Sequence, residues 1–429
     1  MKKFFIALLC IALACSVLAF TACGNDGSEQ SAIPPVEDSS DSLLDEIFDA
    51  EGTGTTSDGL KYQKFISRSK RIKKAYITGY SGEEFNIEIP ERIDGYTITE
   101  ISDSAFRDSE VNSVSLPSSI EQIGNHAFRN CPFLSTVELG SVKAIGNSAF
   151  RQCPILTTVT LPETCTYLGE SAFSECTSLV SVNIPSKVTE LNNFVFNRCE
   201  SLKQIIIPST VTRIGDGVFY YCKSLENIQI PASVTSIGGS VFEGCESLKT
   251  ANVNASWGKI TERTFYGCYS LESIIIPEGI VFIEGNAFYG CLGLTSVKMP
   301  STMQTIYSSA FYGCDNLQEV VLNEGVTTIY DNAFGSNYDA VSPGVMERHL
   351  TSVVIPSTVL KIERGAFCLG RSYINENSDV SYNDRDYMFG SGWTSVLAKV
   401  YCRVSSKPTA WADNWTNCAE SSIVWGYTN

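Results

Sequence analysis

The chain has 429 residues, and its 31 basic and 47 acidic residues give a formal net charge of −16. Such an acidic balance argues against broad nucleic-acid binding, which depends on a basic surface. The sequence has two histidines, His126 and His349, and contains no nucleophile elbow, phosphate loop or dinucleotide fingerprint. We therefore expect a protein that is not an enzyme, has no catalytic residues, cofactor or metal site, and carries His126 exposed on its surface.

The first expected element, in residues 1–22, is an export signal. Two lysines precede an apolar stretch at 4–20, which is too short for a stable membrane span and is soon followed by polar sequence. The small residues before Cys23 resemble the cleavage box of bacterial lipoproteins, and this resemblance implies that Cys23 carries a lipid anchor. An ordinary secreted protein cut near Ala22 is the alternative.

Residues 23–58 are predicted to form an acidic disordered tether. Between positions 24 and 58 there are ten Asp and Glu residues and no Lys or Arg. A segment of this composition buries too little apolar surface to fold by itself. Such a tether would hold the folded part of the chain away from the membrane surface.

Residues 59–95 are predicted to form an N-terminal cap of short strands separated by glycine turns. The repeats that follow need such a cap to cover the open end of their core. Seven Lys and Arg residues, and no acidic residue, lie between Lys61 and Lys74. We interpret this basic cluster as an edge hairpin whose charge prevents strand-to-strand aggregation. Contact with an anionic membrane or wall polymer is the alternative.

A phenylalanine recurs every 22 or 23 residues through most of the remaining chain. The positions are Phe106, Phe128, Phe150, Phe173, Phe196, Phe219, Phe242, Phe265, Phe288, Phe311 and Phe334, followed after a wider gap by Phe367. This self-similarity indicates a repeat architecture in which each copy buries its apolar face against its neighbours. We place the solenoid at 96–369, with an insertion near 335–349.

Within each copy, Ile or Val alternates with polar residues, which predicts a short strand with one buried face that ends at proline. The phenylalanine is expected to fill the core, stacked on the ring of the next copy. Gly238 is expected at a corner that needs a positive φ. Nine cysteines, each three places after a core Phe, are expected to form a ladder of buried, unpaired thiols. They are Cys131, Cys153, Cys176, Cys199, Cys222, Cys245, Cys268, Cys291 and Cys314.

The pattern Leu-x-x-Ile-x-Ile-Pro, then Ile-Gly, then Ala-Phe-x-x-Cys resembles the 23-residue leucine-rich repeats of BspA-type bacterial surface proteins. The resemblance covers roughly 89–367, although Gly140, Asn254 and Asn323 replace the proline in three copies. It implies a mostly β, right-handed solenoid of about 12 coils with short parallel strands and caps at both ends. It also implies a role in cell-surface adhesion or in binding host proteins, for which the repeat consensus itself is only scaffold.

Residues 370–429 are predicted to be an irregular segment followed by a C-terminal cap. Several aromatic residues in this region, including Trp411, Trp415 and Trp425, are expected to seal the end of the core. Cys402 and Cys418 are candidates for a local disulfide in an exported protein.

Two rows of candidate binding residues lie on the outside of the repeats. Apolar residues occupy outward strand positions at Ile206, Ile275, Val321 and Val354. Tyrosines directly follow the core Phe at Tyr220, Tyr266, Tyr289 and Tyr312, and tyrosine supplies both contact area and a hydroxyl group. The alternatives are that β-branched residues simply favour strands and that the tyrosines belong to the repeat consensus.

Together these features predict a lipid-anchored protein displayed at the bacterial cell surface. Its expected function is adhesion, through recognition of an extracellular or host protein by the solenoid. The competing functions are binding of cell-wall or host polysaccharide and service as a self-associating structural spacer. We expect no nucleic-acid partner and no membrane contact beyond the lipid anchor.

Overall fold

The computed structural model describes residues 48–68, 71–335, 350, 352–367, 399–414, 416 and 423–428. All of these residues belong to one compact unit, Val36–Asn429. Their regular structure is β-strand, apart from one 3-10 helix, η2 (Ala255–Trp257). Within these residues there is no helix of the length and apolar character that a membrane crossing requires. The expected signal peptide and the lipid-attachment residue Cys23 lie outside the described residues.

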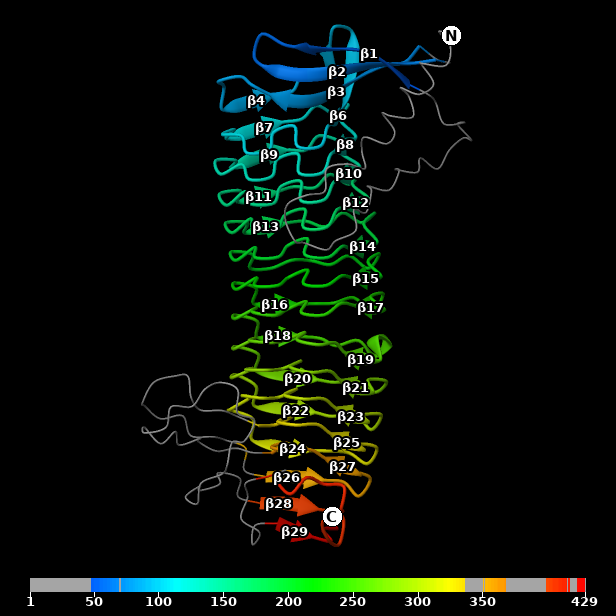
Figure 1. Ribbon diagram of the computed structural model, residues 1–429, viewed down its shortest axis with the longest axis vertical. Helices are drawn as coiled ribbons and strands as arrows, with labels where there is room; N and C mark the ends of the chain where they lie inside the picture. The colour runs from blue at the N-terminus through cyan, green and yellow to red at the C-terminus, as the bar shows by residue number, and fades with distance from the viewer. Residues whose placement is uncertain are drawn as a thin grey trace, which may run out of the picture. The chain divides into compact units, whose positions relative to one another are not determined.

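Two columns of short strands run through the repeats (Figure 1). The first column, built mainly by the Leu-x-x-Ile motif, consists of β4 (Asn86–Glu88), β7 (Ser113–Ser115), β9 (Thr136–Glu138), β11 (Thr158–Val159), β13 (Ser181–Val182), β16 (Asn227–Ile228), β18 (Thr250–Ala251), β20 (Ser273–Ile275), β22 (Ser296–Lys298), β24 (Glu319–Val321), β26 (Ser352–Ile355), β28 (Lys399–Cys402) and β29 (Ile423–Trp425).

The second column lies on the other side of the coils. It consists of β6 (Tyr96–Ile101), with β5 (Arg92–Ile93) paired antiparallel to it, followed by β8 (Gln122–Ile123), β10 (Ala144–Ile145), β12 (Tyr167–Leu168), β14 (Glu190–Leu191), β15 (Arg213–Ile214), β17 (Ser236–Ile237), β19 (Lys259–Ile260), β21 (Phe282–Ile283), β23 (Thr305–Ile306), β25 (Thr328–Ile329) and β27 (Lys361–Ile362). Strands of neighbouring copies pair in parallel, for example Ile145 with Leu168. The mostly β solenoid predicted from the repeats is therefore confirmed.

The N-terminal end of the solenoid is covered by an antiparallel sheet of β1 (Phe48–Thr55), β2 (Leu60–Ser67) and β3 (Lys73–Tyr80). β3 pairs in parallel with β6, which joins this sheet to the second column. The prediction of a disordered tether over 23–58 is therefore wrong from Phe48 onward. None of the side chains of β1 is buried, so the strand is held by its backbone pairing with β2, which local composition does not reveal.

The sequence predicts that the basic cluster at 61–74 forms an edge hairpin. This prediction is wrong, because β1 pairs along the outer side of β2 and is itself the edge strand. Acidic residues that come from outside the cluster pair with it. Asp49 in β1 accepts two hydrogen bonds from Arg68, at 2.5 and 2.6 Å. Asp94 forms an ion pair with Lys64 at 3.4 Å. The cluster is therefore partly neutralised by one acidic residue that precedes it and one that follows it in the sequence.

The core phenylalanines form one continuous stack along the solenoid. From Phe106 to Phe367, consecutive ring centroids lie 4.9–5.9 Å apart and neighbouring ring planes are within 13° of parallel. Tyr80 on β3 extends the stack into the N-terminal sheet, 5.8 Å from Phe106. The step from Phe334 to Phe367 is 5.1 Å, so the inserted sequence leaves the stack unbroken. The predicted core role of these rings is confirmed.

Nine buried thiols run beside the phenylalanine stack, as their spacing predicts. Each donates a hydrogen bond, at 3.0–3.3 Å, to the carbonyl oxygen of the core Phe in the preceding coil. Cys222, for example, donates to Phe196 O, which also accepts the backbone N–H of Cys199. Burial, and then the nearby Cys222, raises the pKa of Cys199 and Cys245. Such thiols are protonated and poor nucleophiles.

A column of glycines follows the second-column strands in the first half of the solenoid. Gly238 does not have a positive φ, so that prediction is wrong. A Cβ atom at Gly238 would lie only 2.5 Å from the backbone nitrogen of Asp216 in the preceding coil. This close approach lets the Asp216 Oδ1 accept a hydrogen bond from Gly239 N at 2.8 Å. The left-handed positions lie instead two residues before and after the core Phe, as at Ser240 and Gly244.

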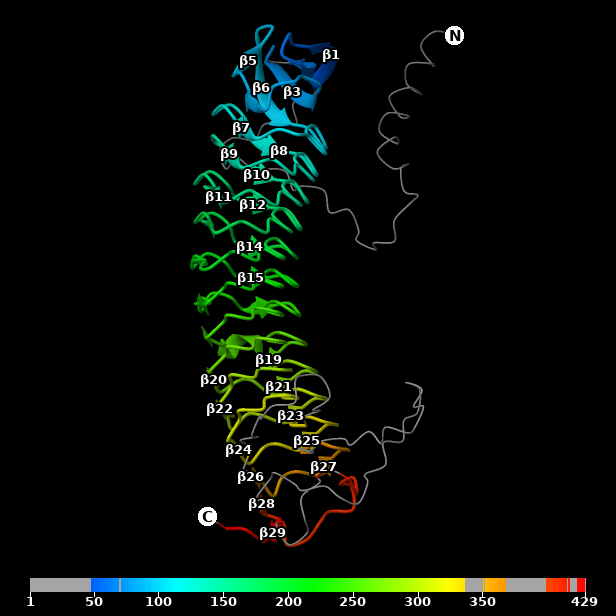
Figure 2. The ribbon, with the colours of Figure 1, turned by 90° about the vertical axis from the view of Figure 1, so that its left-hand side faces the viewer.

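At the other end of the described coils, β26, β28 and β29 form neighbouring parallel strands (Figure 2). Trp411 is 2% exposed, and its indole nitrogen donates a hydrogen bond to Val359 O at 3.3 Å. The ring of Trp425 lies 6.1 Å from that of Trp411. These contacts cover the apolar interior of the last coil. Trp415, and the predicted disulfide partner Cys418, lie outside the described residues.

Candidate binding surfaces

The apolar outward positions predicted on the strands do not form one patch. Ile206 and Ile275 are 84% and 71% exposed. The two coils between them carry Gln229 and Asn252 at the same position, which separates the isoleucines. Single exposed apolar residues are normal on a soluble surface, so these two side chains alone do not define a binding site.

The last two residues of this row behave differently from each other. Val321 in β24 is 42% exposed, whereas its register partner Val354 in β26 is only 9% exposed. The prediction that Val354 lies on an open surface is therefore wrong. On its other side β26 pairs with β28, and the larger Tyr401 occupies the same register position as Val354. Val354 thus lies between two neighbours on one face of the sheet.

Three of the four predicted tyrosines lie together. The rings of Tyr266, Tyr289 and Tyr312 are stacked, with centroid separations of 4.7 and 5.0 Å along the axis. Burial raises the pKa of Tyr289, so its hydroxyl group is neutral under physiological conditions. The fourth, Tyr220, is two coils from Tyr266, because Glu243 occupies this position in the coil between them.

Glu243 fixes the first ring of the tyrosine stack. Its side chain is 3% exposed, and its two carboxylate oxygens accept hydrogen bonds from Arg263, at 2.5 and 2.8 Å. This pairing raises the pKa of Arg263. The Arg263 guanidinium lies over the ring of Tyr266, 4.1 Å from its centroid. A paired charge and a cation–π contact therefore hold Tyr266 in place.

Two further tyrosines, which the sequence reasoning missed, lie beside this stack. The ring of Tyr221 lies 4.6 Å from that of Tyr220 and packs over Gly244. Tyr269 is 49% exposed and lies over Gly267 and Gly290, the backbone of two successive coils. The signal was present in the sequence, since both tyrosines adjoin a cysteine of the ladder. We call the six residues together the tyrosine patch. It consists of Tyr220, Tyr221, Tyr266, Tyr269, Tyr289 and Tyr312.

A second aromatic row lies along the second column of strands. Tyr307 and Tyr330 occupy the position that is glycine in the earlier coils, and Phe282 is the first residue of β21. Phe282 and Tyr307 are 36% and 37% exposed, with ring centroids 6.4 Å apart. Tyr307 stacks on Tyr330 at 5.0 Å, and Lys361 lies over the Tyr330 ring at 5.2 Å. This row follows the second column of strands. It provides an aromatic surface distinct from the tyrosine patch.

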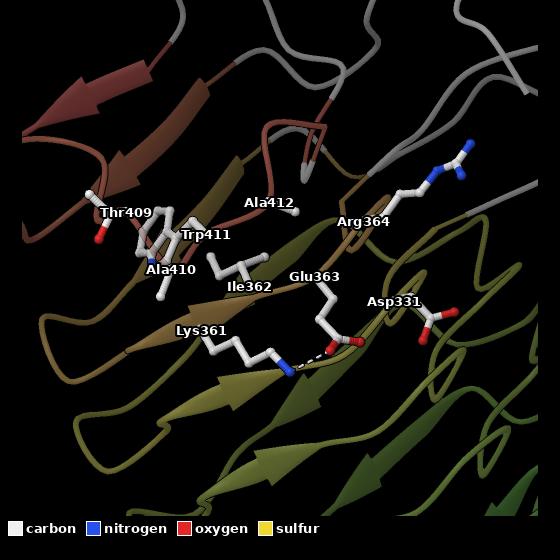
Figure 3. Close-up of a pocket in the computed structure, with 9 residues that line it drawn as sticks. All are labelled: Asp331, Lys361, Ile362, Glu363, Arg364, Thr409, Ala410, Trp411 and Ala412. Carbon is white, nitrogen blue, oxygen red and sulfur yellow. Dashed lines mark ion pairs between the residues drawn. The ribbon is translucent and has the colours of Figure 1, made fainter. Parts of the chain in front are cut away.

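A shallow hollow of about 350 Å³ lies at the end of this row (Figure 3). Its lining residues are Asp331, Lys361, Ile362, Glu363, Arg364, Thr409, Ala410, Trp411 and Ala412. Lys361 and Glu363 form an ion pair at 2.5 Å within it. The charges in the hollow balance one another, and we assign no ligand to it.

His126 is half-buried, which contradicts its predicted exposure. Its Nδ1 atom is buried and has no hydrogen-bond partner. Burial, followed by the charges of Arg129 and Arg107, lowers the pKa of His126. Among the described residues, no group of three or more His, Cys, Asp or Glu side chains could hold a metal ion. His349 lies outside the described residues.

The stacked coils, the short parallel strands and the columns of Leu, Phe and Cys define a leucine-rich repeat protein. Residues 99–226 and 212–340 match the family described as BspA type Leucine rich repeat region, with 6 copies. The chain belongs to this family. No match was found among the curated proteins.

Solved structures of bacterial repeat proteins are similar to this chain. A leucine rich cell surface protein from Faecalibacterium prausnitzii A2-165 is 28% identical, with a TM-score of 0.51, over 74% of this chain and 92% of that one. A Leucine Rich Repeat protein of T. pallidum is 31% identical, with a TM-score of 0.39, over 46% of this chain and 87% of that one. The pneumococcal vaccine antigen PcpA is 16% identical, with a TM-score of 0.52, over 87% and 97%. The likeness to PcpA is one of fold.

Proposed function

We propose that this chain is a lipid-anchored binding protein of the bacterial cell surface, which recognises an extracellular protein through the tyrosine patch. Membership of the BspA-type family and the similarity to a cell surface protein of Faecalibacterium prausnitzii support display at the surface. The tyrosine patch is the observation that carries the binding proposal. It gathers, on four coils of a rigid scaffold of which three are consecutive, a residue type that is enriched among the hot spots of protein interfaces.

The geometry of the patch favours a protein ligand over a neutral polysaccharide. A sugar ring would pack on an open aromatic face, but Tyr289 is stacked between Tyr266 and Tyr312 at 4.7 and 5.0 Å, and Arg263 lies over the ring of Tyr266. In this part of the patch the ligand would therefore meet mainly ring edges and hydroxyl groups. Tyrosines of this kind offer both apolar area and hydrogen bonds, a combination that suits the mixed surface of a protein. Tyr269, which is 49% exposed, adds apolar area beside the row.

The proposal is tested by screening the purified chain against extracellular proteins, beside an array of glycans. We expect a saturable protein ligand whose binding falls at least about tenfold in Tyr269→Ala, as for an interface hot spot. Tyr307→Ala is the matched control, because Tyr307 is exposed to a similar degree but lies in the other aromatic row. Ile275→Ser tests the strand face. Loss of binding in Ile275→Ser but not in Tyr269→Ala would move the site to the strands.

The two competing functions give different results in the same screen. A neutral glycan that binds without any protein ligand would favour the polysaccharide function. If the chain binds neither a protein nor a glycan, and its sedimentation coefficient rises with protein concentration, the self-associating spacer is favoured. Either result would overturn recognition of a protein by the tyrosine patch.

Attachment by a lipid at Cys23 is part of the same proposal. Cys23→Ser removes the thiol that would carry the lipid chains, so the protein should leave the membrane fraction. The measurement is the distribution of the chain between membranes and culture medium, with Cys131→Ser as a control that alters a buried cysteine of the repeats. Retention of the Cys23→Ser protein on membranes would point to another anchor.

A further inference from the structure

Three arginines lie on consecutive coils near the N-terminal end of the solenoid. Arg107, Arg129 and Arg151 each follow the core Phe of their coil, after the adjacent strands β6, β8 and β10. Backbone hydrogen bonds join the three turns directly. Asp108 N donates to Arg129 O at 2.9 Å, and Asn130 N donates to Arg151 O at 2.8 Å. The fold therefore holds three like charges in one short column.

The outer two arginines are paired and the central one is not. Arg107 forms an ion pair with Asp108 at 3.4 Å, and Arg151 forms one with Glu175 at 2.9 Å. Among the described residues, no side chain forms an ion pair or hydrogen bond with the guanidinium of Arg129. Arg129 is nevertheless half-buried. The carboxylates of Asp108 and Glu175 act on Arg129 from beyond ion-pair distance. This partly desolvated guanidinium between two others therefore has no directly paired anion.

His126 provides a second observation in the same place. Its ring is half-buried beside the column, and its Nδ1 atom is buried without a hydrogen-bond partner. The charged groups that act on it are Arg129, Arg107 and Arg151, opposed by the carboxylate of Asp103. Burial, and then these cations, lowers the pKa of His126 and favours the neutral imidazole. The region thus has donor groups on Arg129, and an Nδ1 atom on His126, that no described residue pairs with directly.

We propose that Arg107, Arg129 and Arg151 form a binding site for a sulfate or phosphate ester group of an anionic glycan, centred on Arg129. The planar fork of arginine matches such oxyanions, and a tetrahedral group has enough oxygens to accept from several guanidinium groups at once. Arg107 and Arg151 each keep N–H donors beyond those used in their ion pairs. The column runs along the solenoid axis, as a polymer with repeated anionic groups requires. The site is separate from the tyrosine patch and does not rest on the proposed function.

His126 reports on the site directly. Burial, and then the arginines, lowers the pKa of His126. An anion bound among the arginines would favour the charged imidazolium, so the pKa should rise. We expect a rise of about 0.5–1 unit in sodium sulfate relative to sodium chloride of equal ionic strength. The titration is followed by NMR of the full chain, with His126→Gln to assign the signal. His349, the second histidine of the chain, is the internal control.

Arg129→Gln should abolish the difference between sulfate and chloride. It should also raise the pKa of His126 in chloride, because it removes the cation that acts most strongly on this histidine. Arg129→Lys, which keeps the charge but loses the fork, provides a second variant with less effect on packing. Arg213→Gln is the matched control, since Arg213 also lies on a coil but pairs with Glu190 elsewhere in the solenoid. An equal response to sulfate and chloride, or a full sulfate response in Arg129→Gln, would overturn the proposal.

The source of the oxyanion is distinguished with oligosaccharides. A heparin oligosaccharide, its desulfated form and a phosphorylated oligosaccharide are each titrated into the full chain. The site is supported if the sulfated or the phosphorylated form binds and Arg129→Gln weakens this binding at least about tenfold. The form that binds identifies the ester group. Binding that is equal for the sulfated and desulfated forms, with none for the phosphorylated form, would show that the anionic group is not recognised and would overturn it.

Discussion

The coils before and after η2 differ at one outward position, the residue that follows the second-column strand. Before η2 this residue is mostly glycine. At Gly146 and Gly215 the preceding coil approaches so closely that the side-chain amide oxygen of its Asn125 or Asn193 accepts a hydrogen bond from the backbone N–H after the glycine. After η2 the position holds larger residues, including Tyr307 and Tyr330, whose rings stack at 5.0 Å. The phenylalanine column, from Phe106 to Phe367, and the cysteine column, from Cys131 to Cys314, run on both sides of η2.

This difference separates what packing requires from what it leaves free. An interior side chain packs against the coil before it and the coil after it, so a substitution in one copy disturbs three coils. An outward side chain meets solvent and the members of its own column. Columns that keep one residue type therefore belong to the structural scaffold. Columns that change along the axis, from arginine to tyrosine or from glycine to tyrosine, are the places to look for ligands.

The largest expected effect lies in the unchanging columns. Phe242→Ala should lower the free energy of unfolding by about 3–5 kcal/mol, because it removes a fully buried ring from the stack. Tyr289→Ala, in a changing column, should cost about 1 kcal/mol, the value of an exposed stacking contact. Urea unfolding followed by circular dichroism measures both. Equal losses would mean that the interior and exterior stacks contribute alike.

The glycine column is tested by a matched pair of substitutions. Gly238→Ala should destabilise the protein by about 1–3 kcal/mol, since the new Cβ would meet the backbone of Asp216 at 2.5 Å. At Gly239 the nearest atom to a new Cβ is Glu262 O, at 3.5 Å, so Gly239→Ala should be nearly neutral. Differential scanning calorimetry compares the melting temperatures. Two similar melting temperatures would show that the coils can move apart at no cost.

A partly buried carboxyl at the junction of the N-terminal sheet and the coils predicts a pH dependence. Burial, then the charge of Asp103, raises the pKa of Glu100 to about 7. In the unfolded state the pKa of Glu100 is lower, so the unfolded state loses this proton at a lower pH than the folded state does. Between the two pKa values the free energy of unfolding therefore falls as the pH rises towards 7. Glu100→Gln should remove this loss.

The expected gain for Glu100→Gln is about 1–2 kcal/mol at pH 8, given the partial exposure of the carboxyl, and near zero at pH 4. Urea unfolding at the two pH values provides the measurement. A gain of the same size at both values would show that ionisation of Glu100 is not the cause.

The smallest expected effect concerns the thiol ladder. Cys222→Ala removes the hydrogen bond to Phe196 O, but that oxygen keeps its bond from Cys199 N. We expect Cys222→Ala to cost about 0.5–1 kcal/mol more than Cys165→Ala, which alters an equally buried cysteine with a longer contact, at 3.6 Å. Chemical denaturation compares the two variants. Equal costs would mean that the thiol–carbonyl bonds contribute nothing to stability.

The interior of the solenoid could be predicted from the sequence because its signals repeat. Phe242 and Cys245 each recur at one spacing, and a column of one residue type has one physical explanation. The tyrosine patch was predicted only in part, since Tyr221 and Tyr269 break the repeat and join the patch through contacts between coils. The buried state of Val354 depends on Tyr401, which comes from a strand far along the sequence.

The N-terminal strand β1 could not be predicted for a related reason. Its composition is that of a disordered segment, and its order comes from pairing with β2 and from the contact between Asp49 and Arg68. Similarly, the role of Gly238 depends on a backbone nitrogen of the preceding coil, not on its own conformation. Sequence patterns describe a residue's own conformation better than the neighbours that another coil brings to it.

The unbroken stack of identical coil contacts has a mechanical consequence. Because each coil is held only by its two neighbours, a pulling force across the solenoid would release terminal coils one at a time. Each coil contributes only a few ångströms while folded, but its 22 or 23 residues extend to roughly 75 Å when pulled straight. We therefore expect the solenoid to lengthen in steps under load, one coil at a time.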